Sequence, residues 1–216
     1  SMDNSKILGM AINVKNDSLE STTSYSVDVG YFNWSDVASG NNYFHVLGKS
    51  KTWSWQQGCM LQWLPKAENN LILYNCEIDG DYGSVIMDVT TNEVKQKITR
   101  PIYAIDHLGQ QGVSLNFSRL ERLRPGYGYS NFPDSTLSDL CPEDDGIYLV
   151  DLKSGQSQLL LTYKMIATFQ NDFLDEGVVH YINHLQFSPD GKNLIFLHIW
   201  QQGSDSKNRK NRMMMY

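Results

Sequence analysis

The sequence has little positive charge and no long apolar run. Lys plus Arg number 18 against 24 Asp plus Glu, which gives a formal net charge of −6. An acidic chain has no general attraction for a phosphate backbone, so nucleic acid is not expected as a partner. No stretch approaches the roughly 18 consecutive apolar residues of a membrane-spanning helix, so membrane insertion is not expected either.

A secretory leader is also lacking at the N-terminus, where no basic region is followed by an apolar stretch and a small-residue cleavage site. Ser1-Met2 has the form of a remnant left by tag removal, which is compatible with a leader peptide that was removed. We therefore expect a cytoplasmic protein, with prior removal of a leader as the alternative.

Cysteine is scarce. The three cysteines are widely spaced, which matches neither a disulfide framework nor a Cys-x-x-Cys metal site. Cys59, Cys76 and Cys141 are expected to be free thiols in a reducing compartment. A bridge between Cys59 and Cys76 is the alternative, because both lie in neighbouring strand-like runs.

The sequence also lacks three familiar catalytic or phosphate-binding patterns: a Ser-His-Asp order, a Gly-rich phosphate loop and a glycosidase carboxylate pair.

What the sequence does have is aromatic residues and internal repeats. Aromatic residues make up 12% of the chain and charged residues only 19%, a composition typical of β-rich proteins. One repeated pattern is a short strand, a turn and a second apolar strand. It occurs at residues 61–74, 103–117 and 185–198, and in the last copy Pro189-Asp190-Gly191-Lys192 supplies the turn.

A second repeated pattern follows two of these copies. Residues 84–94 and 146–157 each read as a strand, an Asp, a polar turn and a return strand, which is the signature of a β-hairpin. Together the two patterns describe a unit of four short antiparallel strands. Such a unit has the form of one blade of a β-propeller.

Two phrases resemble parts of TolB-like and WD-type β-propellers: FSPDGK at residues 187–192 before an apolar strand, and YLVDLKSGQ at residues 148–156. Residues 52–58, 124–129 and 180–184 add a likeness to bacterial propellers related to oligogalacturonate lyase. The resemblance covers about residues 50 to 216 and implies an all-β fold. It implies no particular function, because propellers host many activities.

Chain length limits the number of blades. At about 40 to 45 residues per blade, 216 residues hold about four. We predict an all-β, single-domain partial β-propeller of about four blades, each a four-stranded antiparallel sheet. The expected blade-like units are residues 5–57, 58–99, 100–162 and 178–216, with a long insertion loop at residues 119–145.

The last of these units has no fourth strand after residues 212–216, so the chain reads as a truncated member of the family. Strand edges left unpaired are free to pair with a second copy. The expectation is a homo-oligomer, in its simplest form a homodimer joined through open propeller edges.

Three histidines fall in the last unit. His180 and His184 are four residues apart and share one face of a regular strand, and His198 lies on the strand after the turn. The resemblance to oligogalacturonate lyases implies a divalent metal such as manganese, held by a Gln-x-x-His-x-His stretch. His184 matches that stretch, whereas Val179 and Ile182 stand at its other two positions. Two interpretations of these histidines therefore remain: they form a metal site, or they form hydrogen bonds within the core.

Arginine and tyrosine gather in the predicted insertion loop. Arg119, Arg122, Arg124, Tyr127 and Tyr129 combine guanidinium groups, which bind carboxylates and phosphates, with rings that stack on sugars. On a loop over the mouth of a propeller they favour an acidic oligosaccharide or a nucleotide sugar as the ligand. The alternative is that the arginines pair with acidic residues of the same loop.

The third candidate is the run Trp53-Ser54-Trp55-Gln56-Gln57. Alternation places both tryptophans on one face, which is typical of packing between blades. Gln56 and Gln57 are then candidates for ligand binding at the axial channel.

Two functions fit these residues. The first is a non-catalytic binding or scaffold module, without a cofactor, that recognises a carbohydrate or a protein partner through the loop and the histidine segment. The second is a metal-assisted lyase for acidic oligosaccharides. In that case Arg124 neutralises a uronate carboxylate, the three histidines bind the metal, and a base removes the adjacent proton.

Overall fold

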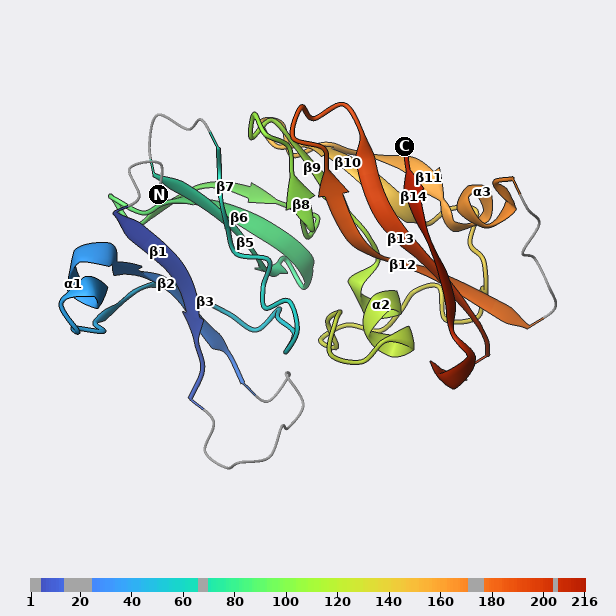
Figure 1. The fold of residues 1–216 in the computed structure, drawn as a ribbon, viewed down its shortest axis with the longest axis horizontal. Coiled ribbons are helices and arrows are strands. Elements are labelled where there is room, and N and C mark those ends of the chain that lie inside the picture. Colours follow the sequence, from blue (N-terminus) through green and yellow to red (C-terminus); the bar gives the residue numbers. More distant parts are fainter. Residues whose placement is uncertain (1–4, 14–24, 66–69, 171–176, 204–205) are drawn as a thin grey trace. The chain divides into compact units, whose positions relative to one another are not determined.

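The computed structural model describes residues 5–13, 25–65, 70–170, 177–203 and 206–216. The fold is all-β, as predicted: the described residues form four antiparallel sheets and three short α-helices (Figure 1). The chain divides into two compact units, residues 1–101 and residues 102–216, and each contains two of the sheets.

The first unit contains a three-stranded and a four-stranded sheet. The three-stranded sheet has the order β1-β2-β3, with β1 at Lys6–Ala11, β2 at Val27–Asn33, α1 at Trp34–Ala38 and β3 at Phe44–Ser50. The four-stranded sheet has the order β4-β5-β6-β7, with β4 at Gln62–Trp63, β5 at Leu71–Ile78, β6 at Asp81–Asp88 and β7 at Glu93–Ile98.

The second unit repeats this combination. Its four-stranded sheet has the order β11-β10-β9-β8, with β8 at Ala104–Ile105, β9 at Gln111–Ser114, β10 at Gly146–Asp151 and β11 at Ser157–Thr162. Its three-stranded sheet has the order β12-β13-β14, with β12 at Val178–Phe187, β13 at Leu194–Gln202, a 3-10 turn at Ser206–Asn208 and β14 at Lys210–Met215. Two helices complete it, α2 at Phe117–Leu123 and α3 at Tyr163–Thr168.

Two predictions need correction. Each blade was expected to have four strands, but within the described residues two of the four sheets have three. The insertion at residues 119–145 was expected to be a loop, but it begins inside α2. The helix forms there because Asn116 caps its first turn and because Phe117, Leu120 and Leu123 bury one apolar side.

The hairpins form where the sequence predicts them. After β6, the Asp88 carboxylate accepts from the N–H groups of Thr90 at 2.8 Å and Thr91 at 3.2 Å. After β10, Asp151 accepts from the N–H of Ser154 at 2.6 Å in the same way. In both hairpins the repeated Asp satisfies the turn backbone, which is the mechanism expected of an Asx turn.

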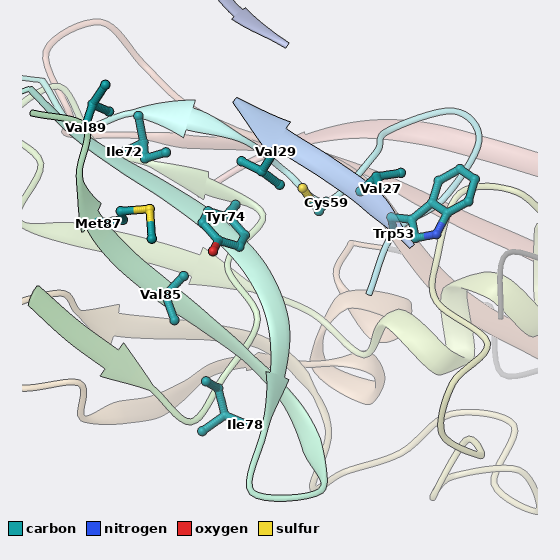
Figure 2. Close-up of a cluster of buried hydrophobic side chains, with 10 residues drawn as sticks. All are labelled: Val27, Val29, Trp53, Cys59, Ile72, Tyr74, Ile78, Val85, Met87 and Val89. Atoms are coloured by element: carbon teal, nitrogen blue, oxygen red, sulfur yellow. The ribbon is translucent and has the colours of Figure 1, made fainter. Parts of the chain in front are cut away.

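The first unit has its own hydrophobic core, drawn in Figure 2. Alternate residues of β2, β5 and β6 point into it, as the period of a half-buried strand requires. The core consists of Val27, Val29, Trp53, Cys59, Ile72, Tyr74, Ile78, Val85, Met87 and Val89.

The cysteines are free, as predicted, and the alternative Cys59–Cys76 bridge is not formed. Burial raises the pKa of the Cys59 thiol to about 12, so this thiol stays protonated and unreactive at neutral pH. Among the described residues, no helix is both long and apolar enough to cross a membrane.

Candidate functional site

The candidate site lies in the second unit and is built on the start of α2. The side-chain oxygen of Asn116 accepts from the N–H of Arg119 at 2.8 Å. Its amide nitrogen donates to Asp145 at 2.7 Å and to Asp134 at 3.2 Å. One side chain therefore fixes both the helix start and two acidic residues of the segment that follows.

Arg119 anchors that segment to β12. Its guanidinium donates to the backbone carbonyls of Thr136, Asp139 and Leu140 at 3.2, 2.9 and 2.8 Å, and its Nε donates to the carbonyl of His180 at 2.8 Å. The side chain is fully buried. The prediction that Arg119 binds a ligand is therefore wrong, because its donors are directed at backbone carbonyls in the interior.

Tyr129 is a second correction. It is fully buried and stacks on Phe117, with the ring centroids 4.2 Å apart and the planes 5° from parallel. This ring packs in the interior and is not available to a sugar.

Arg122 is paired but partly exposed. Its Nε and Nη2 lie 2.9 and 2.8 Å from one carboxylate oxygen of Asp134. Partial burial raises the pKa of Asp134, but hydrogen bonds from Thr136 and Arg122 outweigh it and lower that pKa overall. Arg122 thus follows the alternative prediction of pairing within the segment, while 29% of its side chain remains open to solvent.

The turn after α2 is shaped by Glu121. Its carboxylate accepts from the N–H groups of Gly126 at 2.8 Å and Gly128 at 3.1 Å. A Cβ atom at Gly128 would lie 2.1 Å from the carbonyl oxygen of Phe117, so only glycine fits there. The hydrogen bonds from Glu121 and the close approach at Gly128 fix the conformation of this turn. The turn carries Arg124 and Tyr127.

Arg124, Tyr127 and His184 form a partly exposed group, here called the Arg124 cluster. The guanidinium carbon of Arg124 lies 3.9 Å from the Tyr127 ring centroid, which is a cation–π contact. The ring of His184 meets the Tyr127 ring edge-on at 6.1 Å. Of the predicted site residues, the structure brings these three together.

His184 reaches the surface because β12 contains a bulge. Between Asn183 and Gln186 the strand carries one residue more than β13 opposite, and His184 adopts a φ of 55°. Its N–H donates to the Tyr103 hydroxyl at 3.0 Å and to the Asn183 side chain at 2.8 Å, and the Tyr103 hydroxyl donates to that same oxygen at 2.8 Å. Buried polar contacts therefore hold an unfavourable backbone conformation that presents the imidazole.

His184 is neutral at pH 7. Partial burial and the neighbouring Arg124 charge lower the pKa of its imidazole below the ordinary value of 6.5. A neutral imidazole both donates and accepts a hydrogen bond.

The other two histidines lie elsewhere, and this corrects the predicted three-histidine metal site. His180 and His198 are both fully buried, with Nδ1 of His180 3.0 Å from Nε2 of His198. Arg212 Nε donates to His198 Nδ1 at 3.2 Å. The bulge turns His184 away from this pair, and among the described residues no group of three or more His, Cys, Asp or Glu side chains could hold a metal ion.

A pocket of about 440 Å³ opens beside the turn. This volume falls in the range of small-molecule sites. Its lining is mostly apolar, with one cation and one amide: Arg122, Leu123, Pro125, Leu140, Val179, Gln201 and Gly203.

Gln201 is the notable polar group of this pocket. It is 3% exposed, and its Nε2 donates to the carbonyl of Gly203 at 3.2 Å. Among the described residues, its Oε1 is buried without a hydrogen-bond partner. A buried acceptor that lacks a donor costs free energy, and a ligand hydroxyl or N–H group would remove that cost.

Gln56 and Gln57 belong to the first unit. They lie in a tight turn in which Ser54 and Gly58 exchange backbone hydrogen bonds of 3.0 and 2.8 Å. The rings of Trp53 and Trp55 contact each other edge-on, with their centroids 4.7 Å apart.

Sequence reasoning missed the pocket residues Leu140, Val179 and Gln201. They come from three separate segments. Val179 and Gln201 face each other across β12 and β13, and residue 140 is held against β12 by the His180 N–H and by Arg119. The available signal was the regular apolar pattern of β13, which continues to Gln201 and places its side chain on the same face as Ile199.

No family model and no curated protein sequence matches the chain. Solved structures similar to it include the following two. TolB from Acinetobacter baumannii is 14% identical with a TM-score of 0.44, over 94% of this chain and 38% of that one. Oligogalacturonate lyase in complex with manganese is 11% identical with a TM-score of 0.36, over 97% of this chain and 61% of that one.

Both of these are β-propeller proteins. The chain spans less than two thirds of the length of either, and at these identities the likeness concerns the fold alone.

Proposed function

We propose that the protein is a non-catalytic binding module that takes an acidic carbohydrate, such as a uronate oligosaccharide, in the pocket beside the Arg124 cluster. The observation that carries this proposal is a pocket with apolar walls whose lining residues include Arg122 and Gln201, a glutamine whose buried Oε1 has no hydrogen-bond partner among the described residues. A sugar offers what such a pocket lacks, since it has hydroxyl donors and apolar C–H faces on one ring.

Two arginines favour a negatively charged ligand. Arg122 lines the pocket, and Arg124 stands beside it between the lining residues Leu123 and Pro125. A guanidinium group binds a carboxylate through two parallel hydrogen bonds. Stacking on Tyr127 orients Arg124 before a ligand arrives, which reduces the entropy lost on binding.

Neutral His184 completes the recognition. Its imidazole stands next to Tyr127 on a backbone fixed by Tyr103 and Asn183. In this position it can donate to or accept from a sugar hydroxyl without adding a charge.

Isothermal titration calorimetry with a galacturonate trisaccharide, and with the neutral galactose trisaccharide for comparison, tests the proposal. We expect the acidic sugar to bind more tightly. Arg124→Gln and Gln201→Met should each weaken binding at least about tenfold, because each removes a hydrogen bond worth about 1.5 kcal/mol or more.

Lys192→Gln is the matched control for charge. Lys192 is an exposed cation in the same unit, in the turn between β12 and β13, and its loss should leave affinity unchanged. Equal binding of both sugars, or equal effects of Arg124→Gln and Lys192→Gln, would refute the proposed site. Formation of an unsaturated sugar product would refute the non-catalytic role.

A further inference from the structure

One face of the β12-β13-β14 sheet leads from the pocket toward the β13-β14 hairpin. In an antiparallel pair, residues directly opposite each other lie on the same face, as do residues two apart on one strand. Val179 and Gln201, which line the pocket, are opposite each other, and Tyr181 is opposite Ile199. The face that lines the pocket therefore continues from Val179 to Tyr181.

Arg209 lies over this continuation of the face. It immediately precedes β14, and its Nη1 donates to the Tyr181 hydroxyl at 3.5 Å. Arg209 is exposed, whereas Tyr181 is fully buried. The Tyr181 hydroxyl thus positions a solvent-accessible cation beside the pocket.

A second cation, Arg124, acts on the same tyrosine. Burial raises the pKa of Tyr181, and the charges of Arg209 and Arg124 oppose that increase. Because the interaction between charges falls off with distance, both guanidinium groups lie near the Tyr181 ring. The Arg124 cluster and Arg209 are therefore parts of one positively charged surface.

The other arginines of the second unit are committed to groups of the protein. Arg119 and Arg212 donate to backbone carbonyls, and Arg122 pairs with a carboxylate. Arg124 and Arg209 differ, because within the described part of the chain neither guanidinium contacts a carboxylate. Two cations near one hydroxyl repel each other, and anionic groups of a ligand would relieve this repulsion.

We propose that Arg209 forms a second subsite of the pocket, which takes the carboxylate of a sugar residue next to the one bound at Arg124. The inference rests on the proposed function and narrows its ligand. A uronate ring carries one carboxylate, so two cationic subsites require acidic groups on two neighbouring rings. Arg209 binds the second carboxylate through parallel hydrogen bonds, and Tyr181 is a positioning residue that orients the guanidinium.

NMR titrations with sugars that carry one and three acidic groups test the second subsite. Galacturonate has one carboxylate and the galacturonate trisaccharide has three. At low ionic strength, Arg209→Gln should weaken binding of the trisaccharide about fivefold, which is the upper range for an exposed ion pair. It should leave binding of the monosaccharide unchanged, whereas Arg124→Gln should weaken binding of both.

Lys210→Gln is the matched control. It removes the same charge from the next residue, but Lys210 is opposite Trp200 and so lies on the other face of the sheet. Its loss should change neither affinity.

Tyr181→Phe tests the positioning role. It keeps the buried ring and removes the hydroxyl that orients Arg209. The ratio of trisaccharide to monosaccharide affinity should fall about twofold. Equal weakening of both sugars would instead indicate a general structural defect and would contradict this role.

The outcomes separate the second subsite from the proposed function. Equal trisaccharide affinities of Arg209→Gln and Lys210→Gln would overturn the subsite, and the proposed function would still stand if Arg124→Gln weakened binding. Equal weakening of both sugars by Arg209→Gln would also overturn it, because Arg209 would then serve the first acidic group. Absence of binding of either sugar to the native chain would refute the proposed function and this inference together.

Discussion

Arg119 shows how one buried charge can organise a surface. Its donors satisfy carbonyls from Thr136, Asp139 and Leu140 on one side and from His180 on the other. The Leu140 carbonyl also accepts from the His180 N–H and the Thr136 carbonyl from the Asp139 N–H, so Arg119 matters most for the carbonyls of Asp139 and His180. An unsatisfied buried carbonyl costs about 1 to 3 kcal/mol. The pocket wall at Leu140 is held by this side chain together with the His180 N–H.

We therefore expect Arg119→Gln to lower the free energy of unfolding by about 3 kcal/mol or more, because the carbonyls of Asp139 and His180 lose this donor and the other contacts of the buried guanidinium are lost with it. Urea unfolding followed by circular dichroism measures the change. Arg122→Gln removes only a partly exposed ion pair and should cost less than about 1 kcal/mol. Similar losses for the two variants would show that Arg119 is not the anchor.

The buried pair His180 and His198 predicts a pH dependence of stability. Burial, then the neighbouring His180 and Arg212, lower the pKa of His198 from 6.5 to about 3. Below pH 6.5 the unfolded chain binds a proton at this histidine and the folded chain does not, so stability falls as the pH decreases from 6.5 toward 3.

Replacing the titrating group should flatten this dependence. The free energy of unfolding, measured by urea unfolding at about pH 7 and pH 5, should decrease more for the native chain than for His198→Gln. The difference should reach as much as about 1.4 kcal/mol per pH unit. Parallel pH profiles for the two proteins would contradict the assignment.

At the scale of elements, what the sequence predicts correctly is local. The hairpins after β6 and β10 are specified by Asp88 and Asp151 together with the polar residues that follow each, so reading a dozen residues is enough. The bulge in β12 is different, because the Tyr103 hydroxyl that holds it lies 81 residues away in sequence from His184.

A regular strand places His180 and His184 on one face, and the predicted metal site followed from that geometry. The extra residue at the bulge breaks the alternation, which separates a buried histidine from an exposed one. Arg119 was misread because its partners are backbone carbonyls of distant residues, which become its neighbours only in the folded structure.

Tyr103→Phe should release the bulge without disrupting the core. Removing the hydroxyl takes away one of the two acceptors of the His184 N–H and should cost about 1 kcal/mol of stability. The imidazole then loses its fixed position, so the His184 ring signals in NMR spectra should shift and affinity for the galacturonate trisaccharide should fall.

Tyr148→Phe is the control for this variant. The Tyr148 hydroxyl donates to the Asp144 carbonyl at 3.2 Å, away from the bulge, and its loss should affect neither the His184 signals nor binding. Unchanged His184 signals in Tyr103→Phe would show that the bulge is held by Asn183 alone.

At the scale of the whole molecule, the two units differ in the buried groups that stabilise each of them. Residues 1–101 have a continuous apolar core of β2, β5 and β6, drawn in Figure 2. Residues 102–216 also bury a cation, Arg119, and the His180–His198 pair, whereas the buried polar residues found in the first unit include no arginine or histidine. Buried polar networks are fully effective only when every member is satisfied.

This difference predicts that damage to the polar network stays within one unit. Hydrogen–deuterium exchange followed by mass spectrometry should show that Arg119→Gln lowers protection in β12 and in residues 136–140, where the guanidinium is lost. Peptides from β5 and β6 should keep their native protection, because the core that buries them contains no residue of the second unit. Equal loss of protection in both units would instead mean that the chain unfolds as one cooperative structure.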